Sequence, residues 1–144
     1  MRYFITGGAG FIGSHLVDRL ANIGEVTVYD NLSSGRQELI RQHLDKKSFQ
    51  FIQADILDRD RLSAAMKGAE VVFHLSSNPE VRAGQYNTKV DLEQGTMATY
   101  NVLEAMRQQE IKKIVFASSS VVYGETSGEP VPEDYGPLQP ISLY

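Results

Sequence analysis

The sequence contains no cysteine, so it can form neither a disulfide nor a thiolate metal site. No apolar run is long enough to cross a bilayer, and the opening MRYFITGG is too short in apolar residues for a secretory signal. The net charge of -4 offers no basic surface to a nucleic-acid backbone. We therefore expect a soluble cytoplasmic protein that has no metal site and binds neither membrane nor nucleic acid.

The length of 144 residues suits a single compact domain. Hydrophobic residues make up 42% and charged residues 22%, close to the average of soluble globular proteins. Repeats and low-complexity tracts are missing as well. One domain over residues 1–144 is predicted.

Apolar segments of strand length alternate with segments of helical periodicity. The predicted strands span residues 2–6, 25–30, 49–54, 71–75 and 111–118. The predicted helices span residues 10–23, 58–67 and 90–109, with a further polar helix through Leu39, Ile40 and Leu44. Strands this apolar require cover on both faces, which predicts an α/β, Rossmann-type, doubly wound parallel sheet in three αβα layers. A Gly- and Pro-rich loop follows the fifth strand.

Each predicted helix carries residues whose spacing would form one inward apolar stripe. These residues are Phe11, Ile12, Leu16, Val17 and Leu20 in the first helix, Leu62, Ala65 and Met66 in the short one, and Leu92, Thr96, Thr99, Val102, Leu103 and Met106 in the long one.

A glycine-rich turn joins the first strand to the first helix in TGGAGFIG. Gly7 can adopt the backbone angles of a tight turn, Gly10 lets the main chain approach a pyrophosphate, and Gly13 permits close helix packing. The helix N-terminus adds free N–H groups and partial positive charge. The alternative, glycines that only make a tight turn, is disfavoured by the surrounding strand and helix, so a dinucleotide site is predicted.

Asp30 ends the second strand about 20 residues after Gly10, where a carboxylate reaches the adenosine ribose hydroxyls. A carboxylate there repels a 2′-phosphate, so NAD is favoured over NADP. Arg36 keeps NADP open as the lesser alternative, because an arginine nearby can accept that phosphate.

Five segments carry a family resemblance: TGGAGFIGSHL, VYDNLSSG, QADILD, FHLSSNPEVR and SSSVVYG. Together they resemble the N-terminal portion of the extended short-chain dehydrogenase/reductase family, specifically its nucleotide-sugar epimerases. With the glycine turn, the resemblance implies NAD contacts from Gly7, Gly10, Phe11, Ile12, Gly13, Asp30, Asn31, Ser33, Ser34, Gly35, Asp55, Ile56, Leu75, Ser76, Ser77 and Ser118. For Asp55 alone, a helix cap or loop acid is the other interpretation.

The resemblance also implies the catalytic groups. Ser119 lies four residues before the tyrosine of VVYG, and Tyr144 matches the tyrosine of a Tyr-x-x-x-Lys pair. The lysine would lie one helical turn later and lower the pKa of the phenol. The asparagine that the family usually has near the nicotinamide falls at Gly95, which indicates either a close approach or a sequence anomaly.

The implied reaction is epimerisation of a nucleotide sugar through a transient 4-keto sugar, most simply between UDP-glucose and UDP-galactose. A UDP-N-acetylhexosamine is the alternative substrate. Dehydratase or decarboxylase relatives carry an acid just before VYG, where this chain has Ser120 and Val121. A reductase, or a module that binds NAD without catalysis, also stays open. We expect a longer polypeptide that continues into a substrate-binding part and forms a homodimer, in part through the long helix.

Overall fold

The computed structural model describes every residue except Ser127, Glu129, Ser142 and Leu143. Its centre is a five-stranded sheet in the order β3-β2-β1-β4-β5, and all four pairings are parallel. The strands are β1 (Arg2–Thr6), β2 (Glu25–Asp30), β3 (Phe49–Gln53), β4 (Val71–His74) and β5 (Ile114–Phe116). The strand order reverses between β1 and β4, which is where doubly wound sheets bind ligands.

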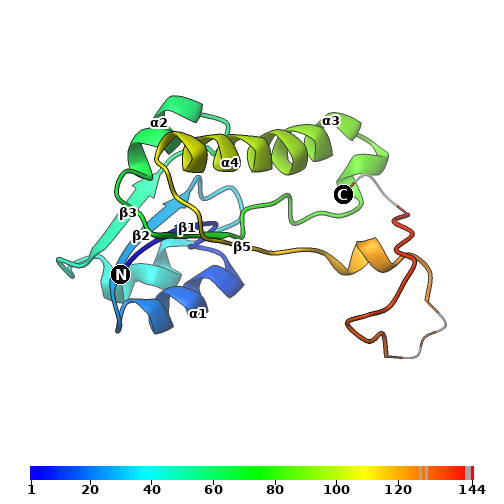
Figure 1. The fold of residues 1–144 in the computed structure, drawn as a ribbon, viewed down its shortest axis with the longest axis horizontal. Coiled ribbons are helices and arrows are strands. Elements are labelled where there is room, and N and C mark those ends of the chain that lie inside the picture. Colours follow the sequence, from blue (N-terminus) through cyan, green and yellow to red (C-terminus); the bar gives the residue numbers. More distant parts are fainter. Residues whose placement is uncertain (127, 129, 142–143) are drawn as a thin grey trace.

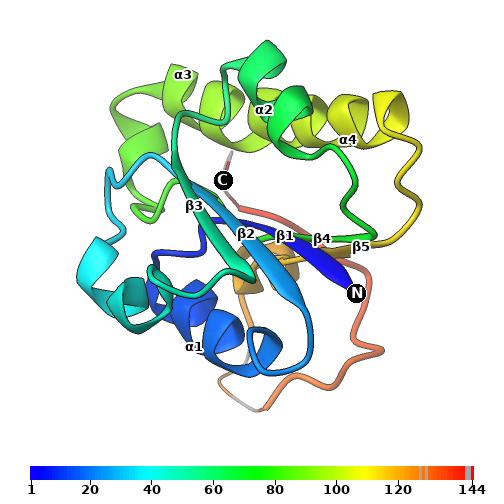
Figure 2. The same cartoon turned by 90° about the vertical axis from the view of Figure 1, so that its left-hand side faces the viewer.

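Helices cover both faces of the sheet (Figures 1 and 2). One face carries α1 (Phe11–Leu20) and the 3-10 helix η1 (Gln37–His43). The other carries α2 (Arg59–Ala65), α3 (Thr88–Asp91), the π-helix η3 (Leu92–Met97) and α4 (Ala98–Gln108). Two short 3-10 helices, η2 (Ala83–Gln85) and η4 (Ser120–Tyr123), lie in connections. The predicted three-layer Rossmann-type fold is confirmed.

The side chains of β1 alternate between two cores. Tyr3 and Ile5 pack with α1 and η1, whereas Phe4 packs with α2 and α4 on the opposite face. Burying a side chain as large as Phe4 stabilises the fold by about 2 to 3 kcal/mol. This alternation fixes the register of β1, so Thr6 and Gly7 arrive at the carboxyl edge of the sheet.

Part of the stripe predicted for α1 is wrong. Val17 and Leu20 are buried, but Phe11 and Ile12 are 76% and 69% exposed. The first turn of α1 lies beyond the strand ends, where no strand is available to cover it.

The long helix also departs from the prediction. Of its predicted stripe, only Val102 and Met106 are buried, whereas Leu92 and Leu103 are about half exposed. The π-helix η3 places an additional residue in the turn before α4 and rotates the preceding side chains relative to the core. Within α4, Ala98, Asn101 and Ala105 complete the buried face together with Val102 and Met106.

Two further elements are shorter or tighter than predicted. The segment after the β2 loop is a 3-10 helix in which Ile40 is buried and Leu39 is exposed. Strand β5 covers only Ile114–Phe116, because Ile111 instead packs into the core after α4.

Strand β5 is an edge strand whose side chains are uncovered. Ile114, Val115 and Phe116 are 37% to 55% exposed. After β5 the chain runs beyond the carboxyl edge of the sheet and returns toward α3 (Figure 1). In the described part of the chain, none of the helices has both the length and the apolar character to span a membrane.

Candidate functional site

A cavity of about 1010 Å³ lies at the carboxyl edge of the sheet. Residues at or just after the end of every strand contribute to its wall, which matches the edge where open parallel sheets bind ligands. Of the predicted site residues, the cavity brings together Gly7, Gly10, Phe11, Ile12, Gly13, Asp30, Asn31, Ser33, Ser34, Gly35, Ile56, Leu75, Ser76, Ser77, Ser118, Ser119 and Tyr144. Residues far apart in the sequence thus share one wall.

The glycine turn is shaped by close backbone approaches. Gly7 has φ of +71°, and a Cβ there would lie 2.8 Å from the backbone nitrogen of Ser76. At Gly13 a Cβ would fall 2.2 Å from the carbonyl oxygen of Gly7. Only glycine fits at either position, since any side chain would push the turn away from β4 or α1. The turn leaves the N-terminus of α1 facing the cavity, which suits a pyrophosphate.

Asp30 organises the loop beside the glycine turn. Its carboxylate accepts hydrogen bonds from the backbone N–H groups of Ala9, at 3.0 Å, and Leu32, at 2.8 Å. The side chain is 8% exposed and lines the cavity. A carboxylate oxygen has two lone pairs, so each oxygen that accepts one backbone bond can still accept another from a ribose hydroxyl.

Asp55 is the one predicted site residue that does not line the cavity. Its two oxygens instead accept hydrogen bonds from the side-chain amide of Asn31, at 3.0 Å, and from the backbone N–H of Leu57, at 2.8 Å. In this structure it acts as the loop acid of the alternative interpretation. It holds Asn31 in place, while its neighbour Ile56 reaches the cavity.

The two predicted catalytic residues, Ser119 and Tyr144, both line the cavity. The Ser119 hydroxyl accepts a hydrogen bond from the Val121 backbone N–H at 3.2 Å, which caps η4. The Tyr144 hydroxyl lies 3.2 Å from the Ser77 hydroxyl, across a separation of 67 residues. A capped serine can still donate its proton, so both hydroxyls can serve a ligand in the cavity.

A wall from the long helix was missed in the sequence. It comprises Asp91, Gln94, Gly95, Thr96, Thr99, Tyr100 and Leu103. Gly95 is exposed in this wall, and among the described residues a Cβ there would meet no atom within 4 Å beyond its chain neighbours and the adjacent helix backbone. Of the two interpretations of Gly95, a close approach by another segment of the protein is not found among the described residues. The signal that could have found this wall is the set of polar residues interrupting the apolar stripe.

His74 connects the centre of the sheet to that helix. The Nδ1 atom of the ring lies 2.8 Å from the Thr6 hydroxyl. The Nε2 atom lies 3.2 Å from the Thr99 hydroxyl. The side chain is 1% exposed. Burial disfavours the charged imidazolium and lowers the pKa of His74 to about 4. The ring is therefore neutral at physiological pH.

This low pKa predicts an acid-sensitive stability. Between pH 6.5 and pH 4 the unfolded chain binds a proton at His74 that the folded chain does not, so stability falls as pH falls through that window. The loss should reach about 3 kcal/mol. Denaturant unfolding at a series of pH values should show this loss in the parent and a smaller one in His74→Gln. Equal slopes in the two proteins would contradict a neutral buried His74.

Three structural features of the cavity fit a dinucleotide. They are the glycine turn, which has no room for a Cβ at Gly7 or Gly13, the N-terminus of α1 and the buried carboxylate of Asp30. The model of the NAD dependent epimerase/dehydratase family matches residues 3–144. The chain belongs to this family. Its cofactor is NAD, as the position of Asp30 predicts.

Relatives with family names are 34% to 42% identical to this chain. The chain is 40% identical over 148 residues to the UDP-glucose 4-epimerase of Mycolicibacterium smegmatis, covering 100% of this chain and 47% of that protein. It is 34% identical over 148 residues to UDP-glucuronic acid decarboxylase 1 of Danio rerio, covering 99% of this chain and 34% of the relative. The chain thus spans less than half the length of these relatives.

Solved structures agree in fold. A crystal structure of a UDP-galactose 4-epimerase superposes with a TM-score of 0.85 at 47% identity, covering 100% of this chain and 46% of that one. The UDP-glucose 4-epimerase of Thermus thermophilus, solved in complex with NAD, superposes with a TM-score of 0.87 at 36% identity, covering 100% of this chain and 46% of that one. These likenesses extend over the whole described sheet.

Proposed function

We propose that the polypeptide containing this chain epimerises a UDP-sugar, interconverting UDP-glucose and UDP-galactose. The observation that carries the proposal is the convergence of Ser119 and Tyr144 on the cavity that the glycine turn and Asp30 also line. Relatives that carry the name UDP-glucose 4-epimerase support the choice of substrate. A UDP-N-acetylhexosamine is the alternative sugar.

In this proposal the cofactor lies along the carboxyl edge of the sheet. The turn at Gly7, Gly10 and Gly13 receives the pyrophosphate, and Asp30 accepts hydrogen bonds from the adenosine ribose. The remaining contacts come from the segments that line the same cavity, and they involve Phe11, Ile12, Asn31, Ser33, Ser34, Gly35, Ile56, Leu75, Ser76, Ser77 and Ser118. Asp55 contributes through Asn31, to which it is hydrogen-bonded.

Tyr144 is the proposed acid and base. Bound NAD supplies the hydride acceptor and, in the return step, the hydride donor. The Tyr144 oxygen takes the proton from the sugar hydroxyl as the carbon is oxidised and gives it back on reduction. Ser119 donates a hydrogen bond to the reacting oxygen and stabilises its developing charge. A ketose that turns its other face before reduction leaves with inverted configuration.

Epimerisation is favoured over elimination or decarboxylation because the sequence has no acid directly before the VYG motif. The two residues after Ser119 are Ser120 and Val121, neither of which can protonate a leaving group at neutral pH. The likeness to a UDP-glucuronic acid decarboxylase keeps that chemistry as the second candidate.

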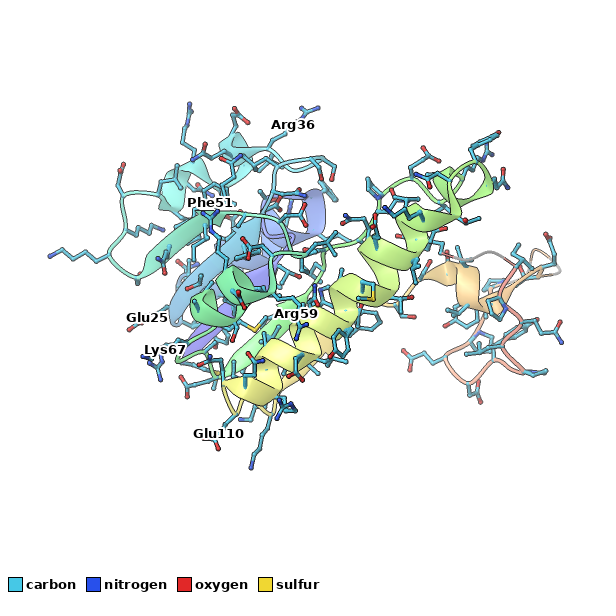
Figure 3. All side chains as sticks on the ribbon, turned by 90° about the horizontal axis from the view of Figure 1, so that it is seen from above. Glu25, Arg36, Phe51, Arg59, Lys67 and Glu110 are labelled. Atoms are coloured by element: carbon cyan, nitrogen blue, oxygen red, sulfur yellow. The ribbon has the colours of Figure 1, made fainter. Side chains whose placement is uncertain are left out.

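We also propose that the longer polypeptide forms a homodimer, in part through α4. Tyr100 and Leu103 on this helix line the cavity but are each 49% exposed. Arg59 of α2, which is labelled in Figure 3, has its guanidinium carbon 5.7 Å from the centre of the Tyr100 ring. Large half-exposed apolar side chains are common at such interfaces. A cytoplasmic location stays a prediction from the sequence.

The polypeptide that contains these residues should convert UDP-galactose into UDP-glucose when supplied with NAD. Chromatography of the nucleotide sugars measures the product, and UDP-glucuronic acid is the parallel substrate. UDP-xylose from the latter would favour the decarboxylase. Tight NAD binding with neither conversion would favour a module that binds NAD without catalysis.

A further inference from the structure

A chain of hydrogen bonds crosses the fold beneath the cavity. The Thr6 hydroxyl lies 3.2 Å from the Leu75 backbone nitrogen, 3.3 Å from the Ser76 nitrogen and 2.8 Å from Nδ1 of His74. On its other side, Nε2 of His74 lies 3.2 Å from the Thr99 hydroxyl. The chain links the strand-end wall of the cavity to its helical wall.

The backbone donors around Thr6 favour one direction for this series of hydrogen bonds. A hydroxyl has one proton and two lone pairs, and the Thr6 hydroxyl accepts from the Ser76 N–H and shares the Leu75 N–H with the Thr6 carbonyl oxygen, which lies 3.2 Å from the same nitrogen. This arrangement leaves the Thr6 proton for Nδ1 of His74. The neutral ring then carries its own proton on Nε2 and donates it to Thr99.

Thr99 is left with an unused proton. Its hydroxyl accepts from His74, and within the described residues no second partner is found for it. A helical threonine commonly donates to a carbonyl one turn earlier, but here that turn belongs to the π-helix η3, whose geometry differs from an α-helix. Thr99 lines the cavity, so its proton is available to a ligand there.

We propose that Thr99 binds the cofactor by donating a hydrogen bond to one of its acceptor oxygens, and that Thr6 and His74 orient this donor. Thr99 is then a binding residue, whereas His74 is a positioning residue. An acceptor oxygen is the chemistry required, and NAD carries such oxygens on its phosphates, riboses and carboxamide. The inference rests on the proposed placement of NAD in the cavity but not on epimerase activity.

The same arrangement explains why a histidine is buried at this position. His74 joins Thr6, which precedes the glycine turn, to Thr99 on the opposite wall. A neutral imidazole can accept at one nitrogen and donate at the other, and so passes the orientation of one hydroxyl to the next. A purely apolar residue at His74 would leave the Thr99 hydroxyl without its hydrogen-bond partner and free to rotate.

The test uses isothermal titration calorimetry to compare NAD binding by the parent protein with NAD binding by three variants. Thr99→Val removes the hydroxyl at nearly constant shape and should weaken NAD binding by about tenfold. Thr99→Ser keeps the hydroxyl and should bind within about twofold of the parent. Thr27→Val, on β2 and outside the cavity wall, is the matched control and should bind like the parent.

Three results would overturn the inference: unchanged binding in Thr99→Val, equal weakening in Thr99→Ser, or equal weakening in Thr27→Val. Failure of the parent itself to bind NAD would overturn the proposed function as well, so the two failures are distinguishable.

Nitrogen NMR of the His74 ring gives a second test. If His74 had only a structural role, its nitrogen resonances would not change when NAD is added. We expect a proton on Nε2 and none on Nδ1, and a shift of the Nε2 resonance on addition of NAD in the parent but not in Thr99→Val. A proton on Nδ1 in the neutral ring would contradict the direction of the chain.

Discussion

Gly13→Ala should destabilise the fold by about 2 to 3 kcal/mol, although alanine favours helices more than glycine does. The added Cβ would lie 2.2 Å from the Gly7 carbonyl oxygen and 2.7 Å from the Gly8 Cα, so the turn must move. Because that movement displaces backbone N–H groups offered to the pyrophosphate, NAD binding should fall by about 100-fold. Denaturant unfolding and titration calorimetry measure the two effects.

Gly95→Ala is the matched control for stability. It is also a glycine in a helical segment, but among the described residues its added Cβ would meet no atom within 4 Å beyond its chain neighbours and the adjacent helix backbone. This variant should unfold with a free energy equal to the parent's or higher by up to about 1 kcal/mol. If the two substitutions changed stability alike, the close packing of Gly13 on the turn could not be the cause.

Tyr144→Phe should lower the rate of UDP-galactose conversion by about 1,000-fold. The phenol oxygen is the proposed proton acceptor, and phenylalanine keeps the ring but removes that oxygen. NAD binding should stay within about threefold of the parent, because the change removes a single hydrogen-bonding group from the wall. Turnover in the longer polypeptide and calorimetric NAD titration separate the two effects.

Tyr123→Phe controls for the loss of a tyrosine hydroxyl. Tyr123 belongs to the VVYG motif but packs edge-on against Tyr135, with ring centres 5.9 Å apart, and does not line the cavity. Its rate should stay within about twofold of the parent. A normal rate in Tyr144→Phe, or an equal loss in Tyr123→Phe, would remove Tyr144 from its proposed role.

The sheet could be predicted from the sequence because parallel strands that are buried on both faces consist of consecutive apolar residues. β1 and β2 match the predicted ranges, and β3 and β4 each end one residue earlier. The glycine turn could also be predicted from the sequence, because the local backbone geometry requires a glycine at positions 7 and 13.

The helical wall of the cavity could not be predicted in the same way. A π-helix depends on tertiary packing and leaves no periodic trace, so the sequence does not predict that Leu92 and Thr96 are exposed while Val102 and Met106 of the same stripe are buried. The partnership of Thr6, His74 and Thr99 joins residues far apart in sequence, and nothing local indicates it. Nothing local in the sequence indicates the hydrogen bond between Asp55 and Asn31, and the contact of Asp55 with the cofactor stays a prediction.

The most direct test of the proposed epimerisation follows the hydrogen on carbon 4 of the sugar. The longer polypeptide is incubated with NAD and UDP-galactose deuterated at that carbon, and the UDP-glucose formed is analysed by mass spectrometry. Oxidation and return of hydride within one closed site predicts that the deuterium is retained on carbon 4, with no exchange into water. Absence of UDP-glucose would contradict the proposed epimerisation. UDP-glucose whose carbon 4 carries hydrogen from the solvent would contradict transfer of hydride to NAD and back.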